Sequence, residues 1–126
     1  MLNTYTPGAT LPTADLERAR AFYEGIGFTE AETSPFGALR FEAGDGGFMV
    51  YESEYAGTNK ATAMAWEVPG EEFDDVVARL REAGITFDTF EMEGAEWDGD
   101  VLTVESMRNV WFRDPDGNIL SVGTMG

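Results

Sequence analysis

The chain has 126 residues, and 24 acidic residues against 8 basic ones give it a formal net charge of −16. With 43% hydrophobic and 13% aromatic residues, it has the composition of one globular domain over 1–126, which excludes a disordered or fibrous chain. A surface this negative repels phosphate groups, which excludes nucleic acid and membrane surfaces as expected partners.

The first elements predicted from the sequence are a short strand and a helix. Weak alternation over Thr4–Leu11 is typical of a strand, which we expect to end at Pro12. Asp15 or Thr13 can cap the helix that follows. The apolar face of this helix, at three- and four-residue steps, consists of Leu16, Ala19, Phe22, Tyr23 and Ile26.

Turn residues divide the next segment into short strands. Ser-Pro-Phe-Gly at 34–37 and Gly-Asp-Gly-Gly at 44–47 are typical of tight turns. The polar segment 55–61 is interpreted as a linker. The three strands predicted between the helix and the linker are Phe28–Thr33, Ala38–Ala43 and Phe48–Glu52.

The same order of elements returns after the linker. Thr62–Val68 predicts a strand, and Pro69 breaks it. Glu71–Ala83 predicts a helix with one apolar face and with acidic residues at its positive end, and Gly84 terminates it. The remaining strands are predicted at Phe87–Glu91, Val101–Arg113 and Asn118–Val122, with a turn over 114–117 before the last one.

The repeated order predicts an α+β fold made of two βαβββ modules. The helix ends match as well, since Phe-Tyr-Glu at 22–24 corresponds to Leu-Arg-Glu at 80–82 and each is followed by glycine within three residues. The modules cover about 1–54 and about 62–126. In each module one helix covers one face of a sheet, so the other face is left for the second module, a partner chain or a ligand.

Two segments near opposite ends of the chain carry a resemblance to a known family. One is Asp-Leu-Glu-Arg-Ala-Arg-Ala-Phe-Tyr-Glu at 15–24, followed by Gly27 and Phe28, and the other is Trp-Phe-Arg-Asp-Pro-Asp-Gly-Asn-Ile-Leu at 111–120. With the repeat between them, the chain resembles the glyoxalase/bleomycin resistance/dioxygenase superfamily, also called the vicinal oxygen chelate superfamily. The resemblance implies that eight strands form a cupped sheet around a cavity, and it implies a homodimer, which would also protect the edges of the sheet.

Metal-dependent members of this superfamily hold one divalent ion with four side chains, usually His or Glu. The resemblance places these positions at Gly8, Tyr51 (or Glu52, one residue later), Ala63 and Ser121. Divalent ions need several carboxylate oxygens, imidazoles or thiolates, and this chain has no cysteine and no histidine. We therefore expect no metal and no other cofactor, and we do not expect metal-dependent glyoxalase or dioxygenase activity.

These positions, combined with strand alternation, predict what lines the cavity. Met49 is in phase with Tyr51. On the strand over 101–113, either Trp111 and the residues in phase with it or Phe112 and the residues in phase with it face the cavity. We favour the set in phase with Trp111, because Phe112 suits the core under the helix. A separate alternative is that the aromatic residues fill the cup, which would then be collapsed and inert. The predicted ligand-binding residues are Met49, Tyr51, Ala63, Trp97, Met107, Trp111 and Ser121.

Acidic residues gather in the segment 82–107, which contains eight of them and no basic residue. Trp97 lies in the middle of this segment, which often flanks the mouth of the cavity in the superfamily. An exposed tryptophan among carboxylates attracts and stacks a planar cation, whereas the alternative is a solvated loop with Trp97 tucked against the sheet. The excess of acid itself has two open explanations, a cationic ligand and adaptation to high salt.

The missing catalytic groups favour binding over catalysis. We predict metal-independent binding and sequestration of a small aromatic, cationic ligand by a protein of the bleomycin-resistance type. The alternatives are a metal-independent lyase or isomerase, with Tyr51, Glu67 or Arg113 handling a proton or an oxyanion, and a structural module with a plugged cup. No apolar run is long enough to span a bilayer and no secretory pattern is visible, so a cytoplasmic protein is expected.

Overall fold

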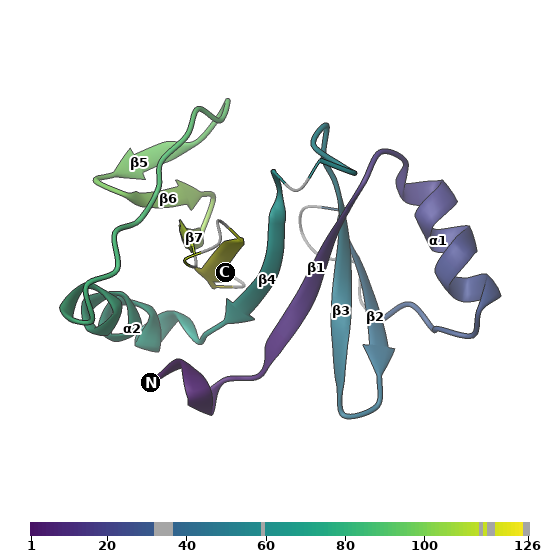
Figure 1. The fold of residues 1–126 in the computed structure, drawn as a ribbon, viewed down its shortest axis with the longest axis horizontal. Helices are drawn as coiled ribbons and strands as arrows, with labels where there is room; N and C mark the ends of the chain where they lie inside the picture. The colour runs from purple at the N-terminus through teal and green to yellow at the C-terminus, as the bar shows by residue number, and fades with distance from the viewer. Residues whose placement is uncertain (32–36, 59, 114, 116–117, 125–126) are drawn as a thin grey trace. The chain divides into compact units, whose positions relative to one another are not determined.

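The computed structural model of the chain forms two compact units, each with one α-helix packed on strands (Figure 1). We call them the N-terminal unit, residues 8–64, and the C-terminal unit, residues 1–7 with 65–126. The predicted turns over 34–37 and 114–117 fall largely outside the part of the chain that the structure describes. The described residues are 1–31, 37–58, 60–113, 115 and 118–124.

The N-terminal unit consists of one helix and a three-stranded sheet. Its strands have the order β2-β3-β1, with β3 antiparallel to β2 and parallel to β1. Helix α1 covers one face of this sheet (Figure 1), and the core between them is built on the buried Leu39, Phe41 and Val50. The elements are β1 (Pro7–Thr13), α1 (Leu16–Gly25), β2 (Leu39–Ala43) and β3 (Gly46–Glu52).

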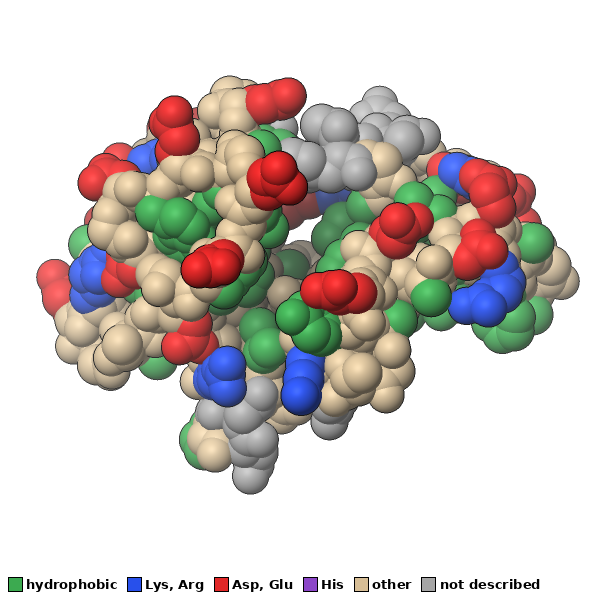
Figure 2. All heavy atoms as spheres, turned by 90° about the horizontal axis from the view of Figure 1, so that it is seen from above, with side chains coloured by type: hydrophobic (Ala, Val, Ile, Leu, Met, Phe, Trp, Pro, Cys, Tyr) green, Lys and Arg blue, Asp and Glu red, His purple; other side chains and the backbone are tan. Residues whose placement is uncertain are grey.

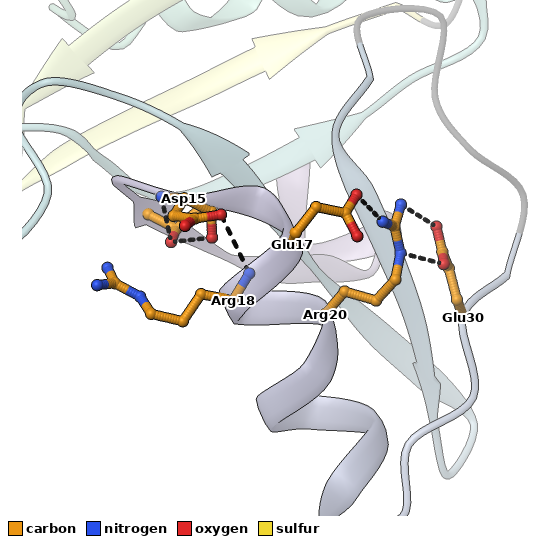
Figure 3. Close-up of polar contacts among 6 residues, drawn as sticks. Asp15, Glu17, Arg18, Arg20 and Glu30 are labelled. Atoms are coloured by element: carbon orange, nitrogen blue, oxygen red, sulfur yellow. Dashed lines mark hydrogen bonds and ion pairs between the residues drawn. The ribbon is translucent and has the colours of Figure 1, made fainter.

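Helix α1 begins at a capping residue and is tied to the chain ahead of β2 by an arginine (Figure 3). The Asp15 carboxylate accepts a hydrogen bond from the backbone N–H of Arg18 at 3.1 Å, which satisfies one of the free N–H groups of the first turn. The Arg20 guanidinium donates to Glu30 Oε2 at 2.9 Å and also to the carboxylate of Glu17. These hydrogen bonds, first the one to Glu30, raise the pKa of Arg20 above its usual value and hold Glu30 beside the helix.

The C-terminal unit consists of a longer helix and a larger sheet. Its strands have the order β4-β8-β7-β6-β5, and the boundary between the units falls within β4. Helix α2 packs the buried Phe73, Val76 and Leu80 against Val110 and Phe112 of β7. A short 3-10 helix, Leu2–Thr4, precedes β1. The elements are β4 (Thr62–Glu67), α2 (Gly70–Glu82), β5 (Glu96–Asp98), β6 (Val101–Val104), β7 (Met107–Arg113) and β8 (Ile119–Gly123).

The predicted fold class, α+β with βαβββ modules, is confirmed. In the described residues there are two α-helices and eight strands. Elements β4, α2, β6, β7 and β8 follow the βαβββ order, and β5 adds a short strand at the edge. Neither α-helix in the described part of the chain is long and apolar enough to cross a membrane.

In the described residues two predicted strands are each reduced to a single bridge, so the prediction of a continuous strand is wrong there. Within the described part of Phe28–Thr33, only Glu30 pairs with β2, and within Phe87–Glu91 only Asp88 pairs with β7. Phe28 and Phe87, two of the apolar residues that suggested these strands, pack into the cores under the two helices. The pattern of apolar residues in these two segments therefore indicates burial and does not indicate a continuous ladder of hydrogen bonds.

Two strand boundaries also differ from the prediction. Strand β1 begins later and runs through Pro12 to Thr13, whose carbonyl accepts from the Ser53 N–H at 2.9 Å. Because alternate residues of a parallel strand turn their backbone groups to opposite sides, Pro12 points its nitrogen away from β3 and costs no hydrogen bond to that strand. The predicted strand Val101–Arg113 is instead the hairpin β6–β7, which reverses at Glu105 with a φ of 55°.

An ion pair joins the end of α2 to the turn before β6, and it predicts a pH dependence of stability. Arg81 donates to both carboxylate oxygens of Asp100, at 2.6 and 2.9 Å, and this holds the pKa of Asp100 below its usual value of 3.8. Because the folded-state pKa is the lower one, the pair stabilises the fold above the unfolded-state pKa, and the stabilisation is lost as the pH falls through the folded-state pKa.

We expect Asp100→Asn to lower the free energy of unfolding at pH 7 by about 0.2–1 kcal/mol, since the pair is partly exposed. The difference from the wild-type protein should vanish below the folded-state pKa of Asp100. Denaturant unfolding of the variant and of the wild-type protein, at pH 7 and at a pH below the folded-state pKa of Asp100, measures this difference. The exposed Asp98 is a matched control, because it forms no ion pair with the described residues. An equal effect of Asp98→Asn would show that the ion pair is not the cause.

Candidate ligand-binding site

The sheet of the C-terminal unit has one face under α2 and one face turned away from α2, which we call the distal face. Val110 and Phe112 are buried in the core under α2, so their neighbours Asn109 and Trp111 lie on the distal face. Cross-strand partners point to the same side of a sheet, which places further residues there. The distal face carries Trp97, Leu102, Met107, Asn109, Trp111, Ser121 and Gly123.

Three aromatic rings, those of Phe90, Trp97 and Trp111, meet at the distal face, and we call them the aromatic cluster. The Phe90 ring meets the Trp111 ring at 4.8 Å and the Trp97 ring at 5.5 Å between centroids, edge to face in both cases. The two indole rings are 6.2 Å apart and tilted by 54°. Phe90 is 41% exposed and both tryptophans are partly exposed, so the rings fix one another while part of their surface faces outward.

Local backbone contacts set the positions of these rings. The Asp88 N–H donates to the Trp111 carbonyl at 2.8 Å, which brings the chain that leads to Phe90 alongside β7. Gly99, with a φ of 65°, makes the turn between β5 and β6 that pairs Trp97 with Leu102. The cluster is therefore held by a strand bridge and a hairpin rather than by a single loop.

Two polar side chains lie beside the aromatic cluster on the distal face. Ser121 is 5% exposed and lies directly opposite Trp111 in the ladder. Asn109 lies between Leu102 and Gly123, and its Oδ1 is buried without a hydrogen-bond partner in the described residues. A Cβ atom added to Gly123 would lie 3.0 Å from this Oδ1. The carboxamide of Asn109 therefore occupies space that a side chain at position 123 would take.

The charges near the aromatic cluster are mostly negative. Glu91, Glu93 and Glu96 are exposed, and Figure 2 shows acidic side chains spread over the face in view. The Arg113 guanidinium donates to the Asp88 carboxylate at 2.9 Å, so this cation is already paired. The excess of carboxylates raises the local concentration of cations through the field that it produces.

The other three predicted site residues belong to the N-terminal unit. Phe48 and Val50 pack in the core under α1, so Met49 and Tyr51 lie on the opposite face of β3. The Tyr51 hydroxyl donates to a carbonyl of β4 at 3.3 Å, and Ala63 of β4 is exposed. The structure thus brings Trp97 and Trp111 into contact, with Met107 and Ser121 on the same face. A role in ligand binding stays a prediction for all seven residues.

The residues at the four metal positions implied by the resemblance do not fit a metal ion. Gly8 and Ala63 have no side-chain donor atom, and Ser121 offers only a hydroxyl. Burial raises the pKa of Tyr51, so its hydroxyl stays protonated near neutral pH. Hydroxyl groups without a carboxylate or an imidazole are a poor ligand set for a divalent ion.

Sequence reasoning did not include two residues of this face among the site residues. Phe90 belongs to the predicted strand Phe87–Glu91, and its place as an aromatic residue in the acidic segment, seven positions before Trp97, is a usable signal for the site. Asn109 was placed in phase with Trp111 but given no role. No sequence signal shows that its carboxamide oxygen is buried, because that depends on the register of Asn109 with Gly123.

Comparison with known proteins identifies the family. The sequence profile described as the glyoxalase/bleomycin resistance protein/dioxygenase superfamily matches residues 5–122. The chain belongs to this superfamily. No curated protein matches it in sequence. The resemblance inferred from the first helix and the last hairpin is therefore confirmed at the level of the superfamily.

Solved structures of other proteins resemble the fold of this chain over nearly its whole length. A Legionella pneumophila protein described as an NAD-dependent benzaldehyde dehydrogenase has a TM-score of 0.67 at 16% identity, with 96% of this chain and 100% of that chain covered. A superfamily member from Vibrio splendidus 12B01 has a TM-score of 0.56 at 11% identity, with 95% and 98% covered. The 2,3-dioxygenase LapB from Pseudomonas sp. KL28 has a TM-score of 0.51 at 20% identity, with 94% and 40% covered. At these identities the likeness extends to the fold alone.

Proposed function

We propose that this superfamily member binds a small, planar, aromatic cation without a metal, on the distal face of its C-terminal unit. The observation that carries the proposal is the aromatic cluster, in which Phe90, Trp97 and Trp111 pack edge to face and remain partly exposed. Binding of this kind needs no reacting group, in keeping with a chain that has no histidine and no cysteine.

The charge around the aromatic cluster supports a cationic ligand. The faces of indole rings are negative and attract cations by about 0.5–2 kcal/mol, and the exposed Glu91, Glu93 and Glu96 add a favourable field. An anionic ligand would meet the same field as a repulsion. Sequestration of such a compound, as in resistance proteins of the bleomycin type, is the role that we propose for this site.

The alternative, a metal-independent lyase or isomerase, has less support. The predicted proton carriers were Tyr51, Glu67 and Arg113. Burial raises the pKa of Tyr51, which keeps this hydroxyl protonated at neutral pH and leaves little phenolate to act as a base, and Arg113 is paired with Asp88. Neither observation favours proton transfer over simple binding.

Trp111→Ala tests the proposal, with acridine orange as a planar cationic probe. We expect the variant to bind the dye more weakly by about 1 kcal/mol or more, which is about fivefold in Kd, because it removes the ring that contacts both other members of the cluster. Isothermal titration calorimetry measures the affinity.

Phe22→Ala is the matched control, since Phe22 is a 60% exposed aromatic residue on α1. We expect this control to bind the dye as the wild-type protein does. Undiminished binding by Trp111→Ala would show that the aromatic cluster is not the site. Chemical conversion of a bound compound in metal-free buffer would favour the enzyme instead.

A further inference from the structure

Asn109 is a polar residue in a row of side chains that crosses the distal face. The ladder places Trp97, Leu102, Asn109 and Gly123 side by side on four adjacent strands. Trp111 follows two residues later on the same strand and the same face. Asn109 is therefore the next residue to Trp111 on this face of β7, and Leu102 separates it from Trp97 of the aromatic cluster.

The carboxamide oxygen of Asn109 is a buried acceptor that no described residue satisfies. Buried carbonyl oxygens nearly always have a partner, because an unmade hydrogen bond costs the desolvation of the group. Such exceptions in a folded protein call for an explanation, and one is a role in recognising a ligand. Here the exception lies beside the aromatic cluster rather than in the core under α2.

Gly123, the cross-strand partner of Asn109, leaves room for the Asn109 carboxamide. Any side chain at position 123 would begin 3.0 Å from both Cγ and Oδ1 of Asn109, which is closer than most side-chain contacts. Gly123 thus leaves room for the carboxamide on the distal face.

We infer that the Asn109 carboxamide oxygen accepts a hydrogen bond from an N–H group of the ligand. The inference rests on the proposed function and narrows its ligand class. The site prefers cations that carry an N–H group, such as protonated heteroaromatic amines, amidinium or guanidinium groups, over quaternary ammonium ions of the same shape. Stacking on the aromatic cluster holds either kind of cation, whereas only the first satisfies Asn109.

Two dyes of one ring system separate these contributions. Acridine orange, protonated at its ring nitrogen, presents an N–H group, and 10-methylacridine orange has the same plane and charge with a methyl group there. We expect wild-type protein to bind the N–H dye about tenfold more tightly, since a hydrogen bond from a charged donor is among the stronger ones. Calorimetry with both dyes gives the ratio of their Kd values.

Asn109→Leu removes the acceptor at similar volume, and we expect it to bring the ratio close to one by weakening the N–H dye. Asn109→Asp retains an acceptor and should retain the preference. The leucine variant should also be at least as stable as the wild-type protein in denaturant, because it no longer buries an unsatisfied oxygen. This stability readout shows whether the variant folds.

The outcomes distinguish the inference from the function on which it rests. A ratio that stays at ten in a folded Asn109→Leu protein overturns the role of Asn109 while leaving stacking intact. A wild-type ratio near one, with Trp111→Ala still weakening both dyes, overturns the inference alone. If neither dye binds the wild-type protein, the proposed function and the inference are overturned together.

Discussion

Replacing Phe73 with alanine lowers the free energy of unfolding by about 3–5 kcal/mol, which is the largest effect that we expect of a single substitution in this chain. Phe73 is fully buried, with 0% of its surface exposed, in the core between α2 and the sheet. The Arg108 guanidinium lies over its ring at 4.6 Å from the centroid and pairs with Asp74 at 2.7 Å. The truncation leaves a cavity and also removes the surface on which this arginine rests.

Denaturant unfolding of Phe73→Ala and Phe22→Ala measures this effect against a matched control. Phe22 is 60% exposed, so the same chemical change there should cost about 1 kcal/mol or less. Equal losses in the two variants would mean that the core under α2 is not what stabilises the fold. A Phe73→Leu protein, which keeps most of the apolar volume, should fall between the wild-type protein and the alanine variant.

Replacing Gly47 with alanine should cost about 1–3 kcal/mol or more through steric overlap. An added Cβ would overlap the carbonyl oxygen of Phe41, which belongs to the backbone of the neighbouring strand β2. A backbone group in a ladder cannot turn aside as a flexible side chain can, so β2 and β3 must separate locally. The expected result is a lower denaturant midpoint with an unchanged slope.

The adjacent Gly46 provides the control for this substitution. An added Cβ at Gly46 meets no atom within 4 Å, so Gly46→Ala should leave the midpoint nearly unchanged. The two variants have the same composition and differ by one position in the same strand. If both lose the same stability, the cause is the loss of glycine itself and not the contact with Phe41.

The sequence predicted the helices well because their apolar residues recur at a strong period. The range Glu71–Ala83 differs from α2 by one residue at each end. Its apolar face proved to be the buried one, and Gly84 follows the end of the helix with a φ of 91°. Capping by Asp15 was likewise one of the two predicted alternatives for α1.

The hairpin β6–β7 shows why other elements could not be predicted. Its reversal occurs at Glu105, a residue that rarely adopts a positive φ, and no glycine or proline marks the turn. Strand β5 has only three residues, too few for an alternation to be visible. In both places the pairing of neighbouring strands determines the backbone, and local sequence preference does not.

The candidate site was predicted in part. Trp111 and Trp97 were expected near a cavity from strand phase and from the acidic segment, and the structure shows them in contact. Their contact with Phe90 depends on the bridge at Asp88, which no local pattern encodes. The homodimer and the ligand-binding roles of all seven predicted residues stay predictions, because they concern a partner chain and a ligand.

The distribution of aromatic residues gives each unit its own spectroscopic reporter. All three tryptophans, at 66, 97 and 111, belong to the C-terminal unit, whereas three of the four tyrosines, at 23, 51 and 55, belong to the N-terminal unit. Indole emission therefore follows the melting of one half of the chain, and phenol absorbance follows mainly the other. Superimposable thermal curves from the two chromophores would mean that both halves melt as a single cooperative body, and separated curves would mean that each half melts alone.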